Sequence, residues 1–251
     1  MEEKNPIQVA DRLFHALELL AENGAMGLKE LSDSLKLNKS TAHRVVTSLI
    51  YLGYARQEEE TGKYEPTFKV VHLANQIMGR VEMVSLLRPY LQKLMERAGE
   101  TVHFVERDGN EAVYIDKIEC FQNSIQMVSR IGNRIPLYCS GVGKAILADL
   151  SDAEIQAVWE NSRIEQRTEH TITKFQEFQK EIQEIRKKGY AVDREENERG
   201  VRCVAVSLSE PSGRGAYAFS ISVPIDRMTE ERIGVLAGEL LKTKEEIRKM
   251  F

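Results

Sequence analysis

Hydrogen-bond donors and positive charge concentrate in residues 37–57, "LNKSTAHRVVTSLIYLGYARQ", which contain no aspartate or glutamate. The whole chain has a formal net charge of -4, so this local absence of acids is unusual. Lysine, arginine, serine and threonine side chains bind phosphate oxygens and base edges, whereas carboxylates among them would repel phosphate. The chemistry that this stretch predicts is therefore recognition of nucleic acid.

An amphipathic helix over residues 40–52 would place these donors on one face. Val45 and Leu49 would then lie on the opposite, apolar face, and Gly53 would end the helix. The exposed face fits the major groove of DNA, where Arg44 can reach guanine edges and the other donors can serve phosphates. The residues expected to contact DNA are Lys39, Ser40, Thr41, His43, Arg44, Thr47, Ser48 and Lys63.

The surrounding elements would position this helix as the reader of a winged helix-turn-helix. Helical spacing of apolar residues predicts a helix over 6–24 and a shorter one over 27–35, and residues 54–66 are typical of a β-hairpin. Residues 1–66 would form this DNA-binding domain. They contain more acids than bases, so one copy should bind weakly and two copies should bind a palindromic site together.

A second candidate for chemistry is "SGVGK" at residues 140–144, which resembles part of a phosphate-binding P-loop. That motif needs a first glycine where the chain has Tyr138, and a metal-binding hydroxyl where it has Ala145. The motif therefore fails at both ends, and nucleotide hydrolysis is not expected.

Nucleophilic catalysis is also not expected. Cys203, His103 and Asp193 supply the residue types of a triad, but nothing in their spacing supports one. The cysteines Cys120, Cys139 and Cys203 form neither a paired framework nor a metal-ligand spacing. We predict no catalytic residue, no metal and no cofactor.

The chain of 251 residues suits two domains, and its character changes after residue 66. Residues 67–98 are predicted to be a helical linker, with Pro89 breaking or kinking its second helix. Residues 99–251 mix hairpins with helices, which indicates an α+β domain of the kind that senses ligands. No apolar run approaches the ~20 residues of a membrane span, so we expect a cytoplasmic protein.

A binding site is predicted in this second domain. In "AYAFSISVP", residues 216–224, bulky apolar side chains alternate with Ser220 and Ser222 on the other strand face. "SGVGKA" would begin a helix, where backbone N–H groups attract anions, and Asp193 could accept a hydroxyl hydrogen bond. The alternative is that both serines face solvent and that the glycines serve packing.

From end to end, the chain resembles the IclR family of transcriptional regulators. The resemblance is carried by "KSTAHRVVTSLIYLGY", "RIPLYCSGVGKAILA" and "ENERGVRCVAVSL" in this order. It implies a GAF/PAS-like effector-binding domain joined to the DNA-binding domain, and a homodimer or a tetramer of dimers. The effector-binding positions of the family fall on Met127, Ile135, Gly141, Val142, Asp193, Val201, Cys203, Ser220 and Ser222.

The expected function is that of a DNA-binding repressor of a catabolic operon, controlled by a small carboxylic acid. Residues 112–138 look most like the family branch that senses 2-keto-3-deoxygluconate and related sugar acids, and Ser124 is consistent with a larger cavity. Pyruvate or a similar short acid is the second candidate and an aromatic acid the third. A sensor domain that binds a protein partner is the alternative of another class.

Arg44→Ala should weaken binding to the operator by ~1–3 kcal/mol, because it removes one contact to a base. Lys39→Ala should weaken binding to all sequences alike and flatten its salt dependence. Fluorescence anisotropy titrations measure both effects. Unchanged operator affinity in Arg44→Ala would exclude the helix over 40–52 as the reader.

Overall fold

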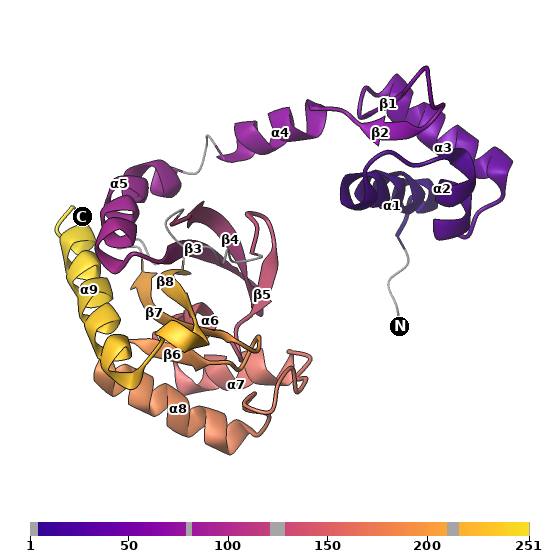
Figure 1. The fold of residues 1–251 in the computed structure, drawn as a ribbon. Helices are drawn as coiled ribbons and strands as arrows, with labels where there is room; N and C mark the ends of the chain where they lie inside the picture. The colour runs from indigo at the N-terminus through magenta and orange to yellow at the C-terminus, as the bar shows by residue number, and fades with distance from the viewer. Residues whose placement is uncertain (1–4, 79–81, 121–128, 210–215, 251) are drawn as a thin grey trace. The chain divides into compact units, whose positions relative to one another are not determined.

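The computed structural model describes residues 5–78, 82–120, 129–209 and 216–250. The chain forms two compact units, Met1–Val81 and Glu82–Phe251 (Figure 1). The expected linker over 67–98 is divided between them: its first helix lies in the first unit and its second in the other. The first unit matches the expected helix-turn-helix, and the second is the expected mixed α+β domain.

The first unit has a small apolar core between its helices and a two-stranded hairpin. Leu20, Leu31, Val46 and Leu49 are buried there. Asn38 caps the third helix, because its side chain accepts a hydrogen bond from the backbone N–H of Thr41 at 2.8 Å. The elements are α1 (Gln8–Asn23), α2 (Leu28–Ser34), α3 (Lys39–Tyr51), β1 (Ala55–Gln57), β2 (Tyr64–Pro66) and α4 (Lys69–Met78).

The start of α4 is attached to the end of α3. The Thr67 hydroxyl donates to the carbonyl of Gly53 at 2.6 Å, and the Lys69 ammonium donates to the carbonyl of Leu52 at 2.6 Å. The same ammonium lies 4.5 Å from the ring centroid of Tyr54. Carbonyls at a helix C-terminus lack helical partners, so a lysine here satisfies one of them and also meets the negative end of the helix dipole.

The second unit is built on one six-stranded antiparallel sheet, with strand order β5-β4-β3-β8-β7-β6. The central pair is β3 with β8, which are far apart in the sequence. Their register sets His103 opposite Ser220 and Thr101 opposite Ser222. The strands are β3 (Thr101–Asp108), β4 (Glu111–Ile118), β5 (Arg134–Pro136), β6 (Ala191–Arg194), β7 (Val201–Ser209) and β8 (Ala216–Pro224).

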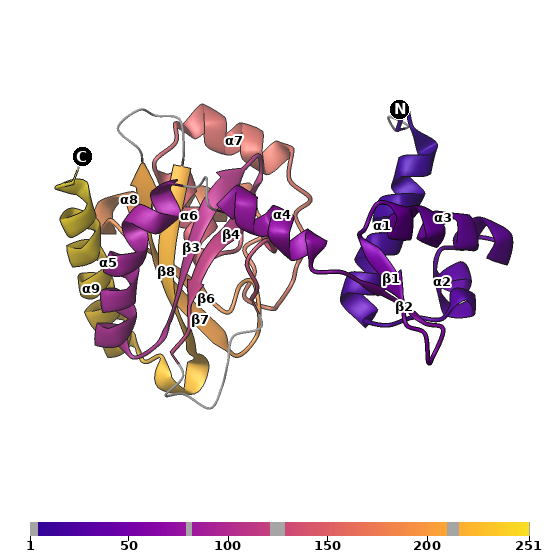
Figure 2. The same cartoon turned by 90° about the horizontal axis from the view of Figure 1, so that it is seen from above.

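Helices cover both faces of this sheet (Figure 2). On one face, α6 (Gly141–Ala148) packs on β6, β7 and β8, with α7 (Asp152–Glu160) and α8 (Phe175–Lys188) outside it. On the other face, α5 (Glu82–Ala98) packs on β3 and β4 and beside α9 (Glu230–Arg248).

Pro89 was expected to break or kink its helix, and of these two outcomes the break does not occur, because α5 continues through Pro89. Proline removes one helical hydrogen bond. Leu87, Leu91 and Leu94 are completely buried along the same helix. Their burial favours the unbroken helix more than the lost bond disfavours it.

Close packing fixes α6 against the segment that follows β5. A Cβ atom on Gly143 would lie 2.3 Å from both the Cα and the carbonyl oxygen of Leu137. Ser140 caps α6, since its hydroxyl oxygen accepts from the N–H of Gly143 at 3.1 Å and the hydroxyl donates to the carbonyl of Pro136 at 2.7 Å. The sequence "SGVGK" is therefore a cap followed by a close backbone contact.

Gly143→Ala should destabilise the second unit by ~1–3 kcal/mol or more, because the new methyl group meets backbone atoms that cannot rotate away. The matched control is Gly234→Ala in α9, where a Cβ would meet nothing within 4 Å. That change should be stabilising by ~0.4–1 kcal/mol. Urea unfolding followed by fluorescence of Trp159, the one tryptophan of the chain, reports on this unit. Equal stability of the two variants would contradict the packing described here.

Candidate functional site

The expected DNA-contact residues lie on the surface of the first unit. Ala42, Val45, Val46 and Leu49 bury the apolar face of α3. Thr41 is half-buried near the start of the helix. The remaining candidates are exposed: Lys39, Ser40, His43, Arg44, Thr47 and Ser48 on α3, and Lys63 in the hairpin.

Two of these hydroxyl groups already donate locally. Ser40 donates to the side-chain oxygen of Asn38 at 2.8 Å, and Ser48 donates to the carbonyl of Arg44 at 2.9 Å. Their hydrogens are committed to the helix. Among the exposed candidates of α3, this leaves Lys39, His43, Arg44 and Thr47 for contacts with DNA, and the fork of donors on Arg44 can form a bidentate bond to a base.

A cavity of about 370 Å³ lies in the second unit, between the start of α6 and the sheet. Eight of the nine positions expected for an effector line it; Met127, like Ser124, is outside the described residues. These eight are Ile135, Gly141, Val142, Asp193, Val201, Cys203, Ser220 and Ser222.

The two serines of β8 form part of the cavity floor. Ser220 and Ser222 are 3% and 4% exposed, so neither projects from an open outer face. Register places Cys203 of β7 opposite Ser222, and Asp193 of β6 opposite Cys203. One strand face of the antiparallel sheet therefore brings these polar groups together beneath α6.

The start of α6 supplies donors to the same cavity. Its first two N–H groups belong to Gly141 and Val142, and neither donates to another described residue. A Cβ on Gly141 would reach to 3.5 Å from the Cβ atoms of Ala205 and Cys203. The glycine thus leaves room between helix and sheet, and the positive end of the helix dipole points into that room.

Several residues that line the cavity were not predicted from the sequence. His103 and Tyr114 come from β3 and β4, and their rings lie 5.1 Å apart. Alternation along β3 could have placed His103 on one face, but only the pairing of β3 with β8 puts that face beside Ser220. The missed residues are His103, Tyr114, Ser129, Ser140, Asn197, Glu198, Arg199, Gly200, Pro224, Ile225 and Asp226.

The groups once considered for a triad do not form one. Cys203 Sγ lies 3.1 Å from Ser222 Oγ, which lies 3.1 Å from His103 Nδ1, so the serine separates the cysteine from the histidine. Burial, together with the negative charge of Asp193, raises the pKa of the Cys203 thiol and keeps it protonated. A neutral thiol is a poor nucleophile.

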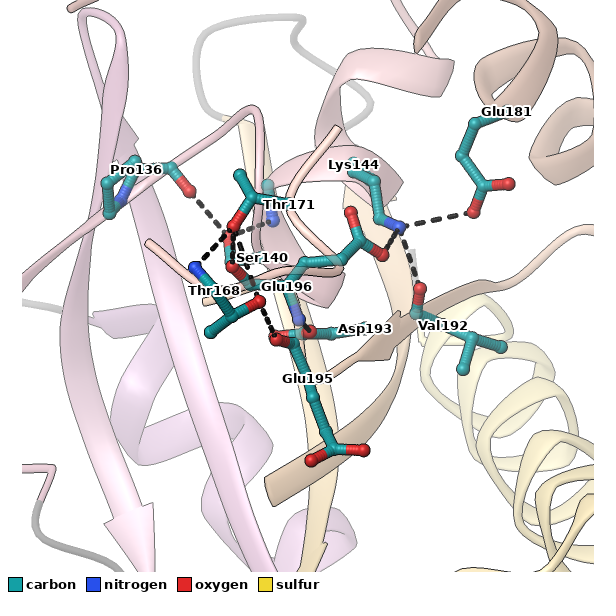
Figure 3. Close-up of polar contacts among 11 residues, drawn as sticks. Pro136, Ser140, Lys144, Thr168, Thr171, Glu181, Val192, Asp193, Glu195 and Glu196 are labelled. Atoms are coloured by element: carbon teal, nitrogen blue, oxygen red, sulfur yellow. Dashed lines mark hydrogen bonds and ion pairs between the residues drawn. The ribbon is translucent and has the colours of Figure 1, made fainter. Parts of the chain in front are cut away.

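An ion cluster around the buried Lys144 joins α6, α8 and β6 beside the cavity, and its contacts are drawn in Figure 3. The ammonium of Lys144 on α6 pairs with Glu196, lies 3.1 Å from a carboxylate oxygen of Glu181 on α8, and donates to the carbonyl of Val192 on β6 at 2.7 Å. Burial lowers the pKa of Lys144, but the two carboxylates outweigh burial and raise it overall. The lysine therefore stays charged.

The turn that follows β6 is held by further polar bonds (Figure 3). Asp193 accepts from the N–H of Glu196 at 2.7 Å. Thr168 and Thr171 donate to the carbonyls of Glu195 and Glu196, each at 2.6 Å. Because this turn leads into Asn197 and the residues after it, these bonds shape the wall of the cavity.

Among the carboxyl groups at this wall, Asp193 has a strongly raised pKa. Burial first, and the charge of Glu196 second, raise the pKa of Asp193 to about 7, although Lys144 opposes this. Near neutral pH the group is therefore close to half protonated. It can donate a hydrogen bond as an acid or accept one as a carboxylate.

Groups that could bind a metal ion and helices that could span a membrane are absent from the described part of the chain. Within it, no cluster of three or more histidine, cysteine, aspartate or glutamate side chains could hold a metal ion. None of the described helices combines the length and apolar character needed to cross a membrane.

A winged helix-turn-helix with an acid-free reading helix, followed by a sheet domain with a polar cavity, defines a ligand-responsive regulator that binds DNA. Residues 9–59 match the IclR helix-turn-helix domain, and residues 75–249 match the bacterial transcriptional regulator IclR C-terminal domain. The chain belongs to the IclR family and is a transcriptional regulator, not an enzyme.

Individual relatives align over nearly the whole chain. The HTH-type transcriptional regulator KdgR of Escherichia coli is 34% identical, covering 92% of this chain and 88% of its own. The transcriptional repressor IclR of the same organism is 30% identical, covering 96% and 89%. The crystal structure of the Thermotoga maritima IclR superposes with a TM-score of 0.85 at 32% identity, covering 97% of this chain and 98% of that one.

Asp193→Asn should remove a pH dependence from the stability of the protein. The unfolded carboxyl releases its proton near pH ~3.9, whereas the folded one keeps it up to about 7. As pH rises between these values, the wild type should lose stability relative to Asp193→Asn by up to ~1.4 kcal/mol per pH unit, and the difference should level off above pH ~7. Urea unfolding at a series of pH values measures this. A wild type that gains stability over the variant as pH rises would mean that Asp193 is held as an anion.

Proposed function

We propose that this regulator represses a catabolic operon and that a small keto or sugar acid, bound in the cavity, controls its affinity for DNA. The observation that carries the proposal is the set of neutral donors around one cavity: the serine hydroxyls of β8 and the first N–H groups of α6. Several neutral donors can together hold one carboxylate without a cationic partner.

The dimensions of the cavity favour a small polar molecule. Its volume of about 370 Å³ lies at the low end of the ~300–1,000 Å³ usual for ligand pockets. Ile135, Val142 and Val201 supply apolar walls, while Asp193, which lies beside the start of α6, can bond a hydroxyl or keto group. A six-carbon acid with several hydroxyl groups suits both the size and the mixed lining.

Positive charge contributes little to the lining. Arg199 lies at the cavity, but its side chain is 74% exposed and is paired with Glu169 at 2.7 Å. Asp193, Glu198 and Asp226 also line the space. Selection for an anion would therefore come from directed donors at the floor of the cavity, because a carboxylate can only accept hydrogen bonds.

Repression and dimerisation complete the proposal. Similar proteins carry names such as acetate operon repressor and HTH-type transcriptional repressor AllR, which supports repression here. The reading domain has few positive charges, so a homodimer, or a tetramer made of dimers, would supply the affinity that one copy lacks. The effector would act by binding more tightly to an arrangement of the two readers that does not fit the operator.

Thermal unfolding with a panel of acids tests the effector. Gluconate, 2-keto-3-deoxygluconate, pyruvate and benzoate would each be added to the full-length protein. A sugar acid at a hundred times its Kd should raise the Tm by ~5–10 °C. Ser220→Ala should lose most of this shift, because its hydroxyl makes no bond to a described side chain and is free for the ligand. Ser207→Ala, a buried serine of β7 outside the cavity, is the matched control and should keep the shift.

The same acid should release the protein from a bound operator fragment in anisotropy titrations. Stabilisation by benzoate alone would reassign the cavity to aromatic acids. If no acid raises the Tm or changes DNA binding, the carboxylate proposal fails, and a protein partner becomes the better explanation for the sensor domain.

A further inference from the structure

A buried histidine at the cavity floor is hydrogen-bonded through both ring nitrogens. His103 Nδ1 lies 3.1 Å from Ser222 Oγ, and Nε2 lies 2.6 Å from Ser129 Oγ. His103 is 3% exposed, whereas the other histidines, His15, His43, His72 and His170, are all exposed. His103 is thus the buried histidine of the chain, and both of its ring nitrogens contact serine hydroxyl groups.

His103 is neutral in this environment. Burial first, and the charge of Lys117 second, lower the pKa of His103 to about 3. A neutral imidazole carries one N–H donor and one bare nitrogen acceptor. One ring nitrogen of His103 must therefore donate its hydrogen bond, and the other must accept. Either Ser129 donates to Nε2 and Nδ1–H donates to Ser222, or both bonds are reversed.

These two tautomers present different groups to a ligand. When Nδ1–H donates to Ser222, the hydrogen of the serine hydroxyl remains free to point into the cavity. When Nδ1 is bare, Ser222 gives its hydrogen to the ring and offers a ligand only lone pairs. A carboxylate needs a donor, so the first arrangement binds it and the second repels it.

The unequal bond lengths favour the first arrangement. The 3.1 Å between Nδ1 and Ser222 Oγ suits an N–H donor, and the 2.6 Å between Ser129 Oγ and Nε2 suits an O–H donor. Lys117 donates to the carbonyl of Ser129 at 2.9 Å, which holds that residue beside the ring without using its hydroxyl. Cys203, at 3.1 Å from Ser222, can accept the serine hydrogen while the cavity holds no anion.

We propose that His103 is a specificity-determining residue of the cavity: its Nδ1–H tautomer, set by Ser129, orients the Ser222 hydroxyl as a donor and makes the cavity select a carboxylate over the corresponding uncharged amide. This inference rests on the function proposed above and names the positioning group behind it. His103 acts through Ser222, and it selects the charge of the ligand and not its length.

The tautomer can be measured in the full-length protein without any ligand. Long-range ¹H–¹⁵N correlation spectra of ¹⁵N-histidine-labelled protein distinguish a protonated ring nitrogen from a bare one. The His103 signals are assigned by their loss in His103→Asn. We expect Nδ1 to be protonated, and we expect Ser129→Ala to shift the population toward Nε2–H. A wild type that is mainly Nε2–H, before and after addition of an acid, overturns the proposal.

Calorimetric titration with gluconate and gluconamide then tests selectivity. The wild type should bind the acid ~10–100-fold more tightly than the amide, the range expected for hydrogen bonds to a charged group. His103→Leu should lower this ratio several-fold by weakening binding of the acid. His103→Asn can still donate from an amide nitrogen near the place of Nδ1 and should retain the ratio. His170→Asn is the control for an exposed histidine and should match the wild type.

The outcomes separate this inference from the function on which it rests. A structural role for His103 would weaken acid and amide equally, and that result overturns the proposal. If His103→Leu does not fold, Ser129→Ala gives the same comparison, because it removes the hydroxyl that sets the tautomer and leaves the ring in place. If the wild type binds no acid, the proposed function fails. The tautomer measured in the free protein then still shows whether His103 directs the Ser222 hydroxyl as inferred.

Discussion

One buried ammonium group sets the geometry on which the cavity depends. Lys144 extends from α6 and meets the strand before the turn, the turn itself and α8, through Val192, Glu196 and Glu181. Removing a partner from a buried ion pair typically costs ~3–5 kcal/mol, so these segments are coupled. The helix that presents donors to the cavity and the turn that forms its wall are consequently held by the same atom.

The cavity combines this charged support with an uncharged floor. One ammonium is paired with two carboxylates behind the wall, and the charge of Glu196 still reaches the cavity at Asp193, whose pKa it helps to raise. The groups that face the interior from the floor are Ser220, Ser222, Cys203 and the neutral ring of His103. Specificity in such a site comes from the direction of each hydrogen, which explains why small hydroxyl and thiol groups occupy the strand face beneath α6.

Local pattern predicted much of this arrangement, and contacts between distant segments accounted for the rest. The helical spacing of apolar residues predicted which face of α3 is buried, and the alternation of residues along β8 predicted that Ser220 and Ser222 share one face. Both patterns depend on a few neighbouring residues. His103 escaped prediction because its role comes from a strand pairing over more than a hundred residues. Lys144 was noticed only as part of a failed nucleotide motif, and the helix was not expected to continue through Pro89 because packing, which overrides local propensity, is not visible in the sequence.

The attachment of α4 to α3 has a mechanical consequence. Thr67 and Lys69 bond the last carbonyls of the reading-helix segment, so the first turn of α4 cannot tilt without disturbing α3. A ten-residue helix extends ~15 Å, which makes α4 a rigid lever fixed at its DNA-binding end. A torque applied to the far end of α4 would therefore be transmitted through these two hydrogen bonds to the end of α3.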